Sequence, residues 1–245
     1  MPGTVSTLQD FPWEESVQAV KESLRFDSYA AFAEHLFNSL PQNSPQTRRR
    51  YTSLIGRWFF PDHQLSSLPA RVWASYADEN ILRDVMRVCV LSQEPVIAGF
   101  IQQFILPAPP GTWLQTDTFR TYIEQTYGEF KHQSYERLIR TLCKLGFIAK
   151  VGQSWFTRTI PRPATAFLIL LHQRFAPTPR IVPLDQILAD PFWWQAGYRT
   201  PDEVRETLHD AVAAGLIARF VVVDHLEQVT TRYSLDEWLS QGLRL

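Results

Sequence analysis

The stretch SYERLIRTLCKLGFIAKVGQSWFTRT, residues 134–159, decides the fold that we expect for the middle of this chain. Its first half carries leucine and isoleucine at helical spacing up to Gly146, a residue type that commonly ends helices. Its second half has strand-like alternation over 147–151 and 155–159, around the turn sequence 152–154. The stretch therefore predicts a helix followed by a two-stranded hairpin.

A second helix is expected just before this stretch. Residues 116–127 place Phe119, Tyr122 and Ile123 on one side, and a short polar connection then leads to Ser134. Helix, turn, helix and hairpin, in this order, make the winged form of the helix-turn-helix. We therefore expect a winged-helix-like module at 112–176.

The predicted helix 134–145 has two chemically different sides. One side is apolar, and the other carries Arg137, Arg140 and Lys144 at positions i, i+3 and i+7. Arginine and glutamine suit the edges of guanine and adenine, and lysine suits phosphates, so this side predicts nucleic-acid contact. A solvated face of an amphipathic helix gives the same pattern, and that alternative stays open. The candidate nucleic-acid residues of this module are Lys131, Gln133, Ser134, Arg137, Arg140, Thr141, Lys144 and Arg158.

The C-terminal part, 177–245, repeats this order of elements with the opposite charge. A capping box with a first-turn proline opens a helix over 200–215, and 216–223 and 228–233 are expected to form wing strands. The exposed side of that helix is acidic, with Asp202, Glu206 and Asp210. Because such a face repels phosphate, we expect a second winged-helix-like module that is structural or docks a protein.

The first 108 residues predict a helical bundle. Ser44 and Pro45 form an N-cap and a first-turn proline, and they open a helix that ends near residue 59. The sequence LPAPPG at 106–111 stops any helix and is the expected domain boundary. The expected fold is thus mainly α, with an N-terminal helical domain and two winged-helix-like modules, over 1–108, 112–176 and 177–245.

A second basic cluster lies on the helix expected at 44–59. It consists of Arg48, Arg49, Arg50 and Arg57. Positive charge near a helix N-terminus opposes the helix dipole, so helix stability does not explain the first three. Contact with a phosphate backbone and ion pairing with the acidic N-terminal block, 1–41, are both compatible with the pattern.

Composition excludes several classes of protein. The chain is 45% hydrophobic and 13% aromatic, which excludes wholesale disorder. Its net charge of −1 conceals basic blocks at 42–75 and 115–163 between acidic ends, so a nucleic-acid surface must be local. Two cysteines, Cys89 and Cys143, are too few for a disulfide scaffold or a cysteine-based zinc site.

Signatures of enzymes and of membrane proteins are not found. The sequence contains no glycine-rich phosphate loop, no G-x-S-x-G motif and no metal-binding histidine spacing, so we expect no catalysis, metal or cofactor. The longest apolar run, 164–171, is about half of the ~20 residues that a membrane helix needs. No signal-peptide pattern precedes it. These features predict a cytoplasmic protein without membrane contact.

Two segments resemble a known family. NSPQTRRRYTSLIGRWFF at 43–60 and SYERLIRTLCKLGFI at 134–148 resemble the BrxA family of the BREX phage-defence system. The matching positions are Ser44, Thr47, Arg48, Ile55, Arg57, Leu142 and Gly146. The resemblance covers about residues 25–160, and it implies a helical N-terminal part, a winged-helix-like part, DNA binding and work beside other defence proteins. The acidic module after residue 177 is atypical of that family.

We therefore expect a non-enzymatic, DNA-binding accessory protein of a prokaryotic anti-phage defence system, which binds the duplex largely through phosphates. Other defence proteins are the second class of expected partner, with the acidic C-terminal module as their contact. Two other functions stay open: a protein-docking adaptor or scaffold of a multi-protein defence complex, and a winged-helix transcriptional regulator. The residues also leave DNA and RNA undistinguished.

Overall fold

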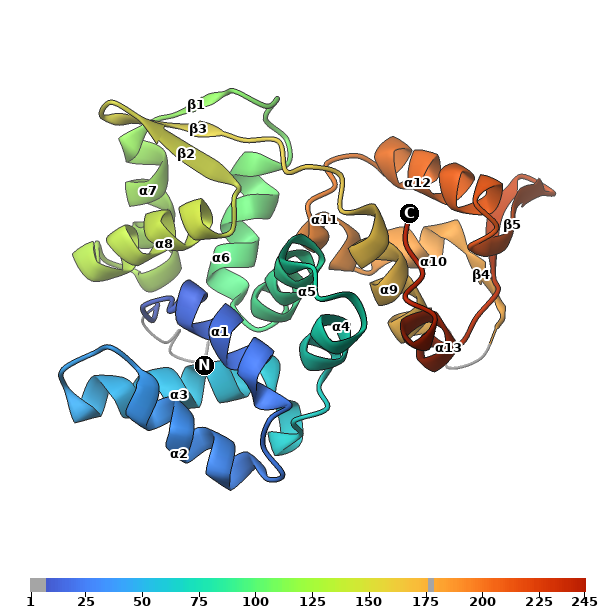
Figure 1. The fold of residues 1–245 in the computed structure, drawn as a ribbon. Helices are drawn as coiled ribbons and strands as arrows, with labels where there is room; N and C mark the ends of the chain where they lie inside the picture. Colours follow the sequence, from blue (N-terminus) through green and yellow to red (C-terminus); the bar gives the residue numbers. More distant parts are fainter. Residues whose placement is uncertain (1–7, 176–178) are drawn as a thin grey trace. The chain divides into compact units, whose positions relative to one another are not determined.

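The computed structural model describes residues 8–175 and 179–245 of the 245-residue chain (Figure 1). The described residues form mostly helices, together with two three-stranded antiparallel sheets. The expected mainly α fold class with small sheets is confirmed at this level. Long periodic segments gave the most accurate helix bounds: the helix expected at 44–59 is α3 (Pro45–Phe59), with Ser44 as its N-cap.

The chain folds into two compact units that alternate along the sequence. Unit 1 combines the N-terminal segment, as far as Trp13, with residues 91–161. Unit 2 combines residues 14–90 with 162–245. This division differs from the three consecutive domains that we expected from the proline-rich stretch.

Unit 1 has a helix, a short strand, two helices and a hairpin. The elements are α6 (Pro95–Phe100), the π-type turn η2 (Ile101–Ile105), β1 (Trp113–Leu114), α7 (Thr116–Tyr127), α8 (His132–Lys144), β2 (Ile148–Val151) and β3 (Ser154–Thr157). The strand order is β1–β3–β2, and the sheet lies next to α7 and α8 (Figure 1). Strand β1 was not predicted, because two residues show no alternation.

The core of unit 1 explains why the expected boundary at 106–111 is wrong. Phe100 of α6 stacks on Phe119 of α7 with ring centroids 4.9 Å apart. Tyr122 of α7 donates a hydrogen bond of 2.6 Å to the Val96 carbonyl. The prolines do end the helix, but the helix before them belongs to the same core as the helices after them.

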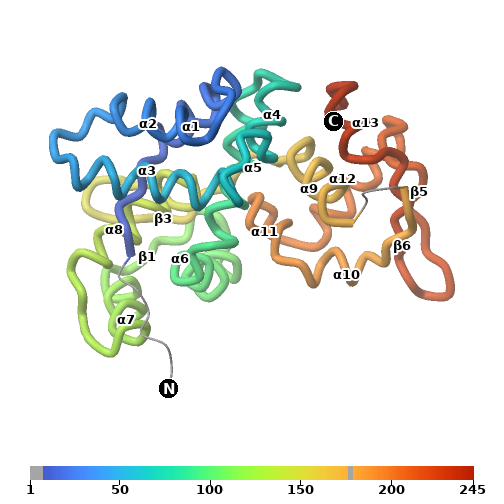
Figure 2. The backbone as a smooth tube through the Cα atoms, turned by 90° about the horizontal axis from the view of Figure 1, so that it is seen from below, coloured from blue at the N-terminus to red at the C-terminus, as the bar shows by residue number. Residues whose placement is uncertain are grey.

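Unit 2 contains the remaining elements. They are α1 (Trp13–Ser23), α2 (Tyr29–Ser39), α3, η1 (Pro61–His63), α4 (Leu68–Tyr76), α5 (Glu79–Leu91), α9 (Ala164–Phe175), β4 (Ile181–Pro183), α10 (Leu184–Ala189), α11 (Phe192–Ala196), α12 (Pro201–Ala213), β5 (Ile217–Val223), β6 (Leu226–Thr231) and α13 (Leu235–Ser240). Helices α2 and α3 run side by side (Figure 2).

The apolar run 164–171 forms α9, and α9 is central to unit 2. Its side chains share one buried core with α4, α5, α12 and α13. In that core, Phe167 stacks on Phe192 of α11 with centroids 5.4 Å apart. The expected assignment of this helix to a module at 112–176 is therefore wrong, since its apolar surface is buried among unit 2 side chains.

The two units repeat one order of elements. In unit 2, α9, β4, α10, α12, β5 and β6 follow each other as α6, β1, α7, α8, β2 and β3 do in unit 1, with α11 added. The second sheet has the order β4–β6–β5, which is the same first–third–second order as the first sheet. The predicted capping box of α12 is present, since Thr200 and Glu203 bond reciprocally.

Candidate nucleic-acid interface

The basic side of α8 contacts the N-terminal segment, residues 8–12, within unit 1. Arg137 donates from Nη1 to the carbonyl oxygen of Leu8 at 2.6 Å, and its Nε lies 3.4 Å from the Asp10 carboxylate. Lys144 donates from Nζ to the carbonyl oxygen of Phe11, also at 2.6 Å. Leu8 and Phe11 are themselves buried. Two of the three predicted recognition cations therefore fasten a segment of the same chain.

These contacts give Arg137 and Lys144 a structural role. The Arg137 side chain is 14% exposed, and its guanidinium has a carbonyl and a carboxylate as partners. A phosphate could replace these partners only if the N-terminal segment left α8. Helical periodicity showed that this side of α8 is polar, but periodicity carries no information about which distant segment covers it.

Arg140 has a different environment. Its side chain is 57% exposed, bonds Glu136 one turn earlier at 3.3 Å and lies 3.7 Å from Asp10. Its charge is partly compensated, but the guanidinium remains at the surface. Arg140 therefore stays a candidate for nucleic-acid contact.

Two predicted contact residues lie in the interior. Ser134 is 0% exposed and Thr141 is 2% exposed, so the prediction of nucleic-acid contact is wrong for both. Both belong to the buried side of α8, together with Leu138. Residue type alone could not place them, because serine and threonine are mostly but not always exposed.

The residues just before α8 remain at or near the surface. Gln133 is exposed, and Lys131 is half-buried, 3.7 Å from the Glu129 carboxylate. The Lys131 ammonium also lies 4.9 Å from the centroid of the Tyr127 ring. Both residues stay candidates, with the charge of Lys131 partly compensated.

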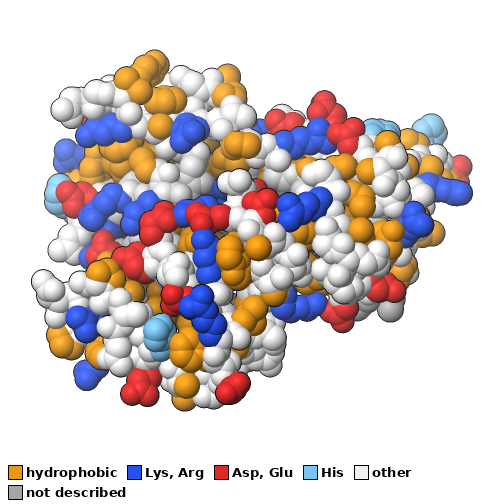
Figure 3. All heavy atoms as spheres, in the orientation of Figure 1, with side chains coloured by type: hydrophobic (Ala, Val, Ile, Leu, Met, Phe, Trp, Pro, Cys, Tyr) orange, Lys and Arg blue, Asp and Glu red, His pale blue; other side chains and the backbone are white. Residues whose placement is uncertain are grey.

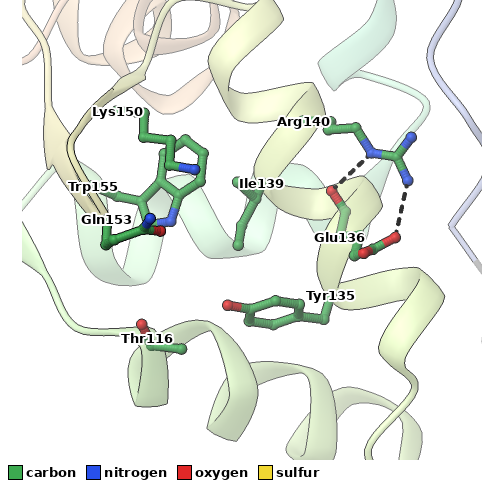
Figure 4. A pocket seen from close by; sticks show the side chains of 8 residues that line it. All are labelled: Thr116, Tyr135, Glu136, Ile139, Arg140, Lys150, Gln153 and Trp155. Carbon is green, nitrogen blue, oxygen red and sulfur yellow. Dashed lines mark hydrogen bonds and ion pairs between the residues drawn. The ribbon is translucent and has the colours of Figure 1, made fainter.

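A pocket of about 610 Å³ lies between α8 and the β2–β3 hairpin (Figure 4). Its lining consists of Thr116, Tyr135, Glu136, Ile139, Arg140, Lys150, Gln153 and Trp155. In Figure 4 the Tyr135 and Trp155 side chains reach toward the same space, one from α8 and one from β3. Sequence reasoning missed this pocket and its aromatic residues.

Strand register explains why residues near the tip of the β2–β3 hairpin line the pocket. Lys150 pairs with Trp155, and the next pair on that face of the sheet, Ile148 with Thr157, is buried against the helices. The Lys150–Trp155 pair is one step closer to the tip and lines the open pocket instead. The Lys150 ammonium lies 5.4 Å from the centroid of the Trp155 ring, within cation–π range.

Two cations, Arg140 and Lys150, line this pocket. The charges of Arg158 and Lys150 also lie near Cys143 on α8, where they oppose the rise that burial causes in the pKa of the Cys143 thiol. Among the described residues that line the pocket, Glu136 is the one carboxylate, and it lies within 3.3 Å of both Arg140 and His132. Figure 3 shows Lys and Arg side chains over α8 and the hairpin, with hydrophobic side chains between them.

The second predicted basic cluster belongs to α3 of unit 2. Arg48 donates to the carbonyl of Gln42 in the loop before the helix. The guanidinium groups of Arg50 and Arg57 lie 5.6 and 5.8 Å from the ring centroids of the aromatic residues that follow them, Tyr51 and Trp58. Arg49 and Arg57 are exposed. This cluster is thus partly used in local contacts.

The α12 face of unit 2 is acidic, as its sequence predicts. Arg205 bonds Glu227 at 2.7 Å and Asp202 at 2.8 Å. Glu206 and Asp210 are exposed on the same helix. The β5–β6 hairpin beside this helix carries exposed apolar residues at its tip: Val222, Val223 and Leu226. The exposed carboxylates of α12 therefore make this face one that repels phosphate.

Within 8–175 and 179–245, no group of three or more His, Cys, Asp or Glu side chains could hold a metal ion. No single helix in this part of the chain has the length and apolar character to cross a membrane. The bent pair formed by 79–91 and 95–105 passes that criterion by length and composition.

Comparisons with protein-family models, curated proteins and solved structures gave no match to this chain.

Proposed function

We propose that the protein binds duplex DNA, largely through phosphates, with the surface between α8 and the β2–β3 hairpin as its interface. The observation that carries this proposal is the pocket with its surrounding cations on α8 and the hairpin. A helix–strand–helix–helix–strand–strand order with strand order β1–β3–β2 supports a winged-helix module. In such a module the second helix of the motif and the hairpin are the elements that approach a duplex.

The residues that we propose to contact DNA differ from those predicted from the sequence. Arg140, Lys150 and Arg158 are exposed cations suited to phosphates, and Gln133 and Gln153 are exposed amides suited to base edges. Arg137, Lys144, Ser134 and Thr141 are left out, because they hold the N-terminal segment or lie in the core.

The resemblance to the BrxA family supplies the cellular setting of this proposal. The resemblance implies DNA binding and work beside other defence proteins of an anti-phage system, and we propose on the sequence features that the protein is non-enzymatic and cytoplasmic. The acidic α12 face and the apolar tip of its wing are the surface proposed for those proteins.

A protein-docking adaptor is the second candidate function. It is favoured by the same wing tip, where Val222 is 67% exposed and Leu226 is 54% exposed. Apolar side chains clustered at the end of a projecting hairpin are more typical of a contact surface than of a free one. Co-purification of other proteins after nuclease treatment, without duplex binding at low salt, would support this function.

Fluorescence anisotropy with a labelled duplex at low salt tests DNA binding. The double variant Lys150→Ala/Arg158→Ala should bind about tenfold more weakly or worse, because it loses two charge-assisted phosphate contacts. The control Arg25→Ala/Arg219→Ala removes the same charge from exposed positions of unit 2 and should bind as the wild type does. Equal affinity of the two double variants would contradict the proposed interface.

A further inference from the structure

We infer that the pocket between α8 and the β2–β3 hairpin receives an unpaired nucleobase, so that the protein prefers a duplex with a single-stranded extension over a blunt duplex. This inference rests on the proposed function, and it names the part of the ligand that the pocket holds. It concerns unit 1 alone, since all lining residues belong to that unit.

The size of the pocket suits a nucleotide. Its volume of about 610 Å³ lies within the range of about 300–1,000 Å³ that is usual for small-molecule sites. The pocket is widely open to solvent and lies between α8 and the β2–β3 hairpin (Figure 4). A protruding group can therefore reach its lining side chains directly from solvent.

The chemistry of the walls suits a base. Trp155 and Tyr135 supply aromatic surface from two elements, and Ile139 adds an apolar side chain between them (Figure 4). Stacking on aromatic side chains tolerates any base, because every base has a π face. The Gln153 amide and the Thr116 hydroxyl are the neutral polar groups that could bond the edge of the base.

Cations at the rim suit the phosphates that flank such a base. The Lys150 ammonium lies 5.4 Å from the Trp155 ring centroid, so a base stacked on that ring would carry its phosphate close to a positive charge. Arg140 lines the opposite wall and is more than half exposed. Aromatic surface with cations around it is the usual composition of sites for single-stranded nucleic acid.

The covered side of α8 explains why this pocket would take an unpaired base. The N-terminal segment lies along the side of α8 that carries Arg137 and Lys144, and it is held there by two hydrogen bonds of 2.6 Å. That segment prevents α8 from entering a major groove with its whole polar face. Bases inside a duplex are stacked, and only a base that leaves the stack can enter the pocket.

Anisotropy titrations of two probes test the inference: a blunt duplex, and the same duplex with a short thymidine overhang. The wild type should bind the overhang probe about fivefold more tightly or better, as expected for one base stacked on an aromatic ring. Trp155→Ala should lose this advantage, so that it binds the two probes with equal affinity. Thermal unfolding verifies that the variant is folded.

Trp113→Ala is the matched control. Trp113 is 54% exposed on β1 and packs against Phe156, which alternates with Trp155, so it lies on the other face of the same sheet. This control should keep the overhang advantage. Trp155→Phe provides a second readout, because it should retain part of the advantage while a thymidine oligonucleotide quenches less of its tryptophan fluorescence.

Equal wild-type affinity for the two probes would overturn the inference and leave the proposed function standing. An overhang advantage that survives in Trp155→Ala would overturn it as well. Failure of the wild type to bind the blunt duplex at low salt would instead overturn the proposed function.

Discussion

Arg137 shows how a single residue can match a functional pattern and still serve the fold. As the sequence predicts, Arg137 lies on the same side of α8 as Arg140 and Lys144. Its partners, however, are a carbonyl and a carboxylate of the N-terminal segment. Hydrogen bonds from a charged group to a mostly buried acceptor contribute more than those at an open surface. Residue type and spacing therefore predicted a cation on this side of α8 and not its use.

Arg137→Ala is expected to lower the free energy of unfolding by about 1–3 kcal/mol, because the Leu8 carbonyl loses a charged donor. Its affinity for duplex DNA should change less than twofold. Lys150→Ala should show the reverse, with little change in stability and weaker binding, since Lys150 is exposed and lines the pocket. Urea unfolding and anisotropy on the same samples separate the two effects, and a large loss of affinity in Arg137→Ala would contradict the structural role.

His172 is a buried titratable residue of α9. Its Nδ1 lies 2.7 Å from the Leu168 carbonyl, its ring lies 4.4 Å from that of Trp238, and its Nε2 has no hydrogen-bond partner among the described residues. Burial lowers the pKa of His172, and the hydrogen bond to the Leu168 carbonyl opposes that shift only in part. The neutral form is thus the native one.

This environment predicts a pH dependence of stability. Below the ordinary histidine pKa of about 6.5, the unfolded chain binds a proton that the native His172 does not, so stability decreases as the pH falls. Above that value the contribution is fully present. The expected slope is at most about 1.4 kcal/mol per pH unit, until the lowered native pKa is reached. Urea unfolding of the wild type and of His172→Asn from pH 7.5 to 5.5 should show a smaller decrease in the variant; parallel curves would contradict this account.

At the scale of elements, the contact between α2 and α3 depends on Gly56. This glycine lies inside α3, and a Cβ there would overlap the hydroxyl oxygen of Tyr29 on α2. Gly56 belongs to the sequence segment that resembles the BrxA family. This contact explains why glycine occupies a position inside α3 at which alanine would stabilise the helix by about 1 kcal/mol.

Gly56→Ala is expected to destabilise the protein by up to about 1 kcal/mol, since the Tyr29 side chain must turn away from the new Cβ and lose part of its packing, which offsets the gain in helix propensity. Removing the obstructing hydroxyl in Gly56→Ala/Tyr29→Phe should restore most of that loss. Thermal or urea unfolding of the two single variants and the double variant measures the coupling. Strictly additive effects would show that the Tyr29 hydroxyl is not the obstacle.

Elements differ in how well the sequence predicts them. Helices such as α3 and α12 carry caps and an apolar stripe over several turns, so their bounds were predicted closely. Strands β1 and β4 have two and three residues and gain their conformation from pairing with β3 and β6. The pocket depends on that pairing too, because Lys150 and Trp155 become neighbours only in the observed register, in which Val151 pairs with Ser154. The predicted turn at 152–154 would instead pair Val151 with Trp155 and place Lys150 opposite Phe156.

At the scale of the whole molecule, the net charge of −1 would not attract a polyanion. Binding then depends on a local group of cations, and its strength must depend strongly on salt. If Arg140, Lys150 and Arg158 each neutralise one phosphate, the logarithm of the association constant should fall with the logarithm of salt concentration with a slope of about −2 to −3. Anisotropy titrations at several salt concentrations measure this slope. For Lys150→Ala/Arg158→Ala the slope should approach −1, and an unchanged slope would exclude these residues as phosphate contacts.

The alternation of the two units along the chain has a consequence for synthesis on the ribosome. Val85 and Val88 of α5 share their core with Phe167 and other residues of α9, and these emerge only after residues 91–161 have been made. The nascent chain must therefore keep the apolar surface of its early helices soluble while an intervening portion is translated. Chaperone binding and aggregation of truncated products should accordingly be greatest for chains that stop just short of α9.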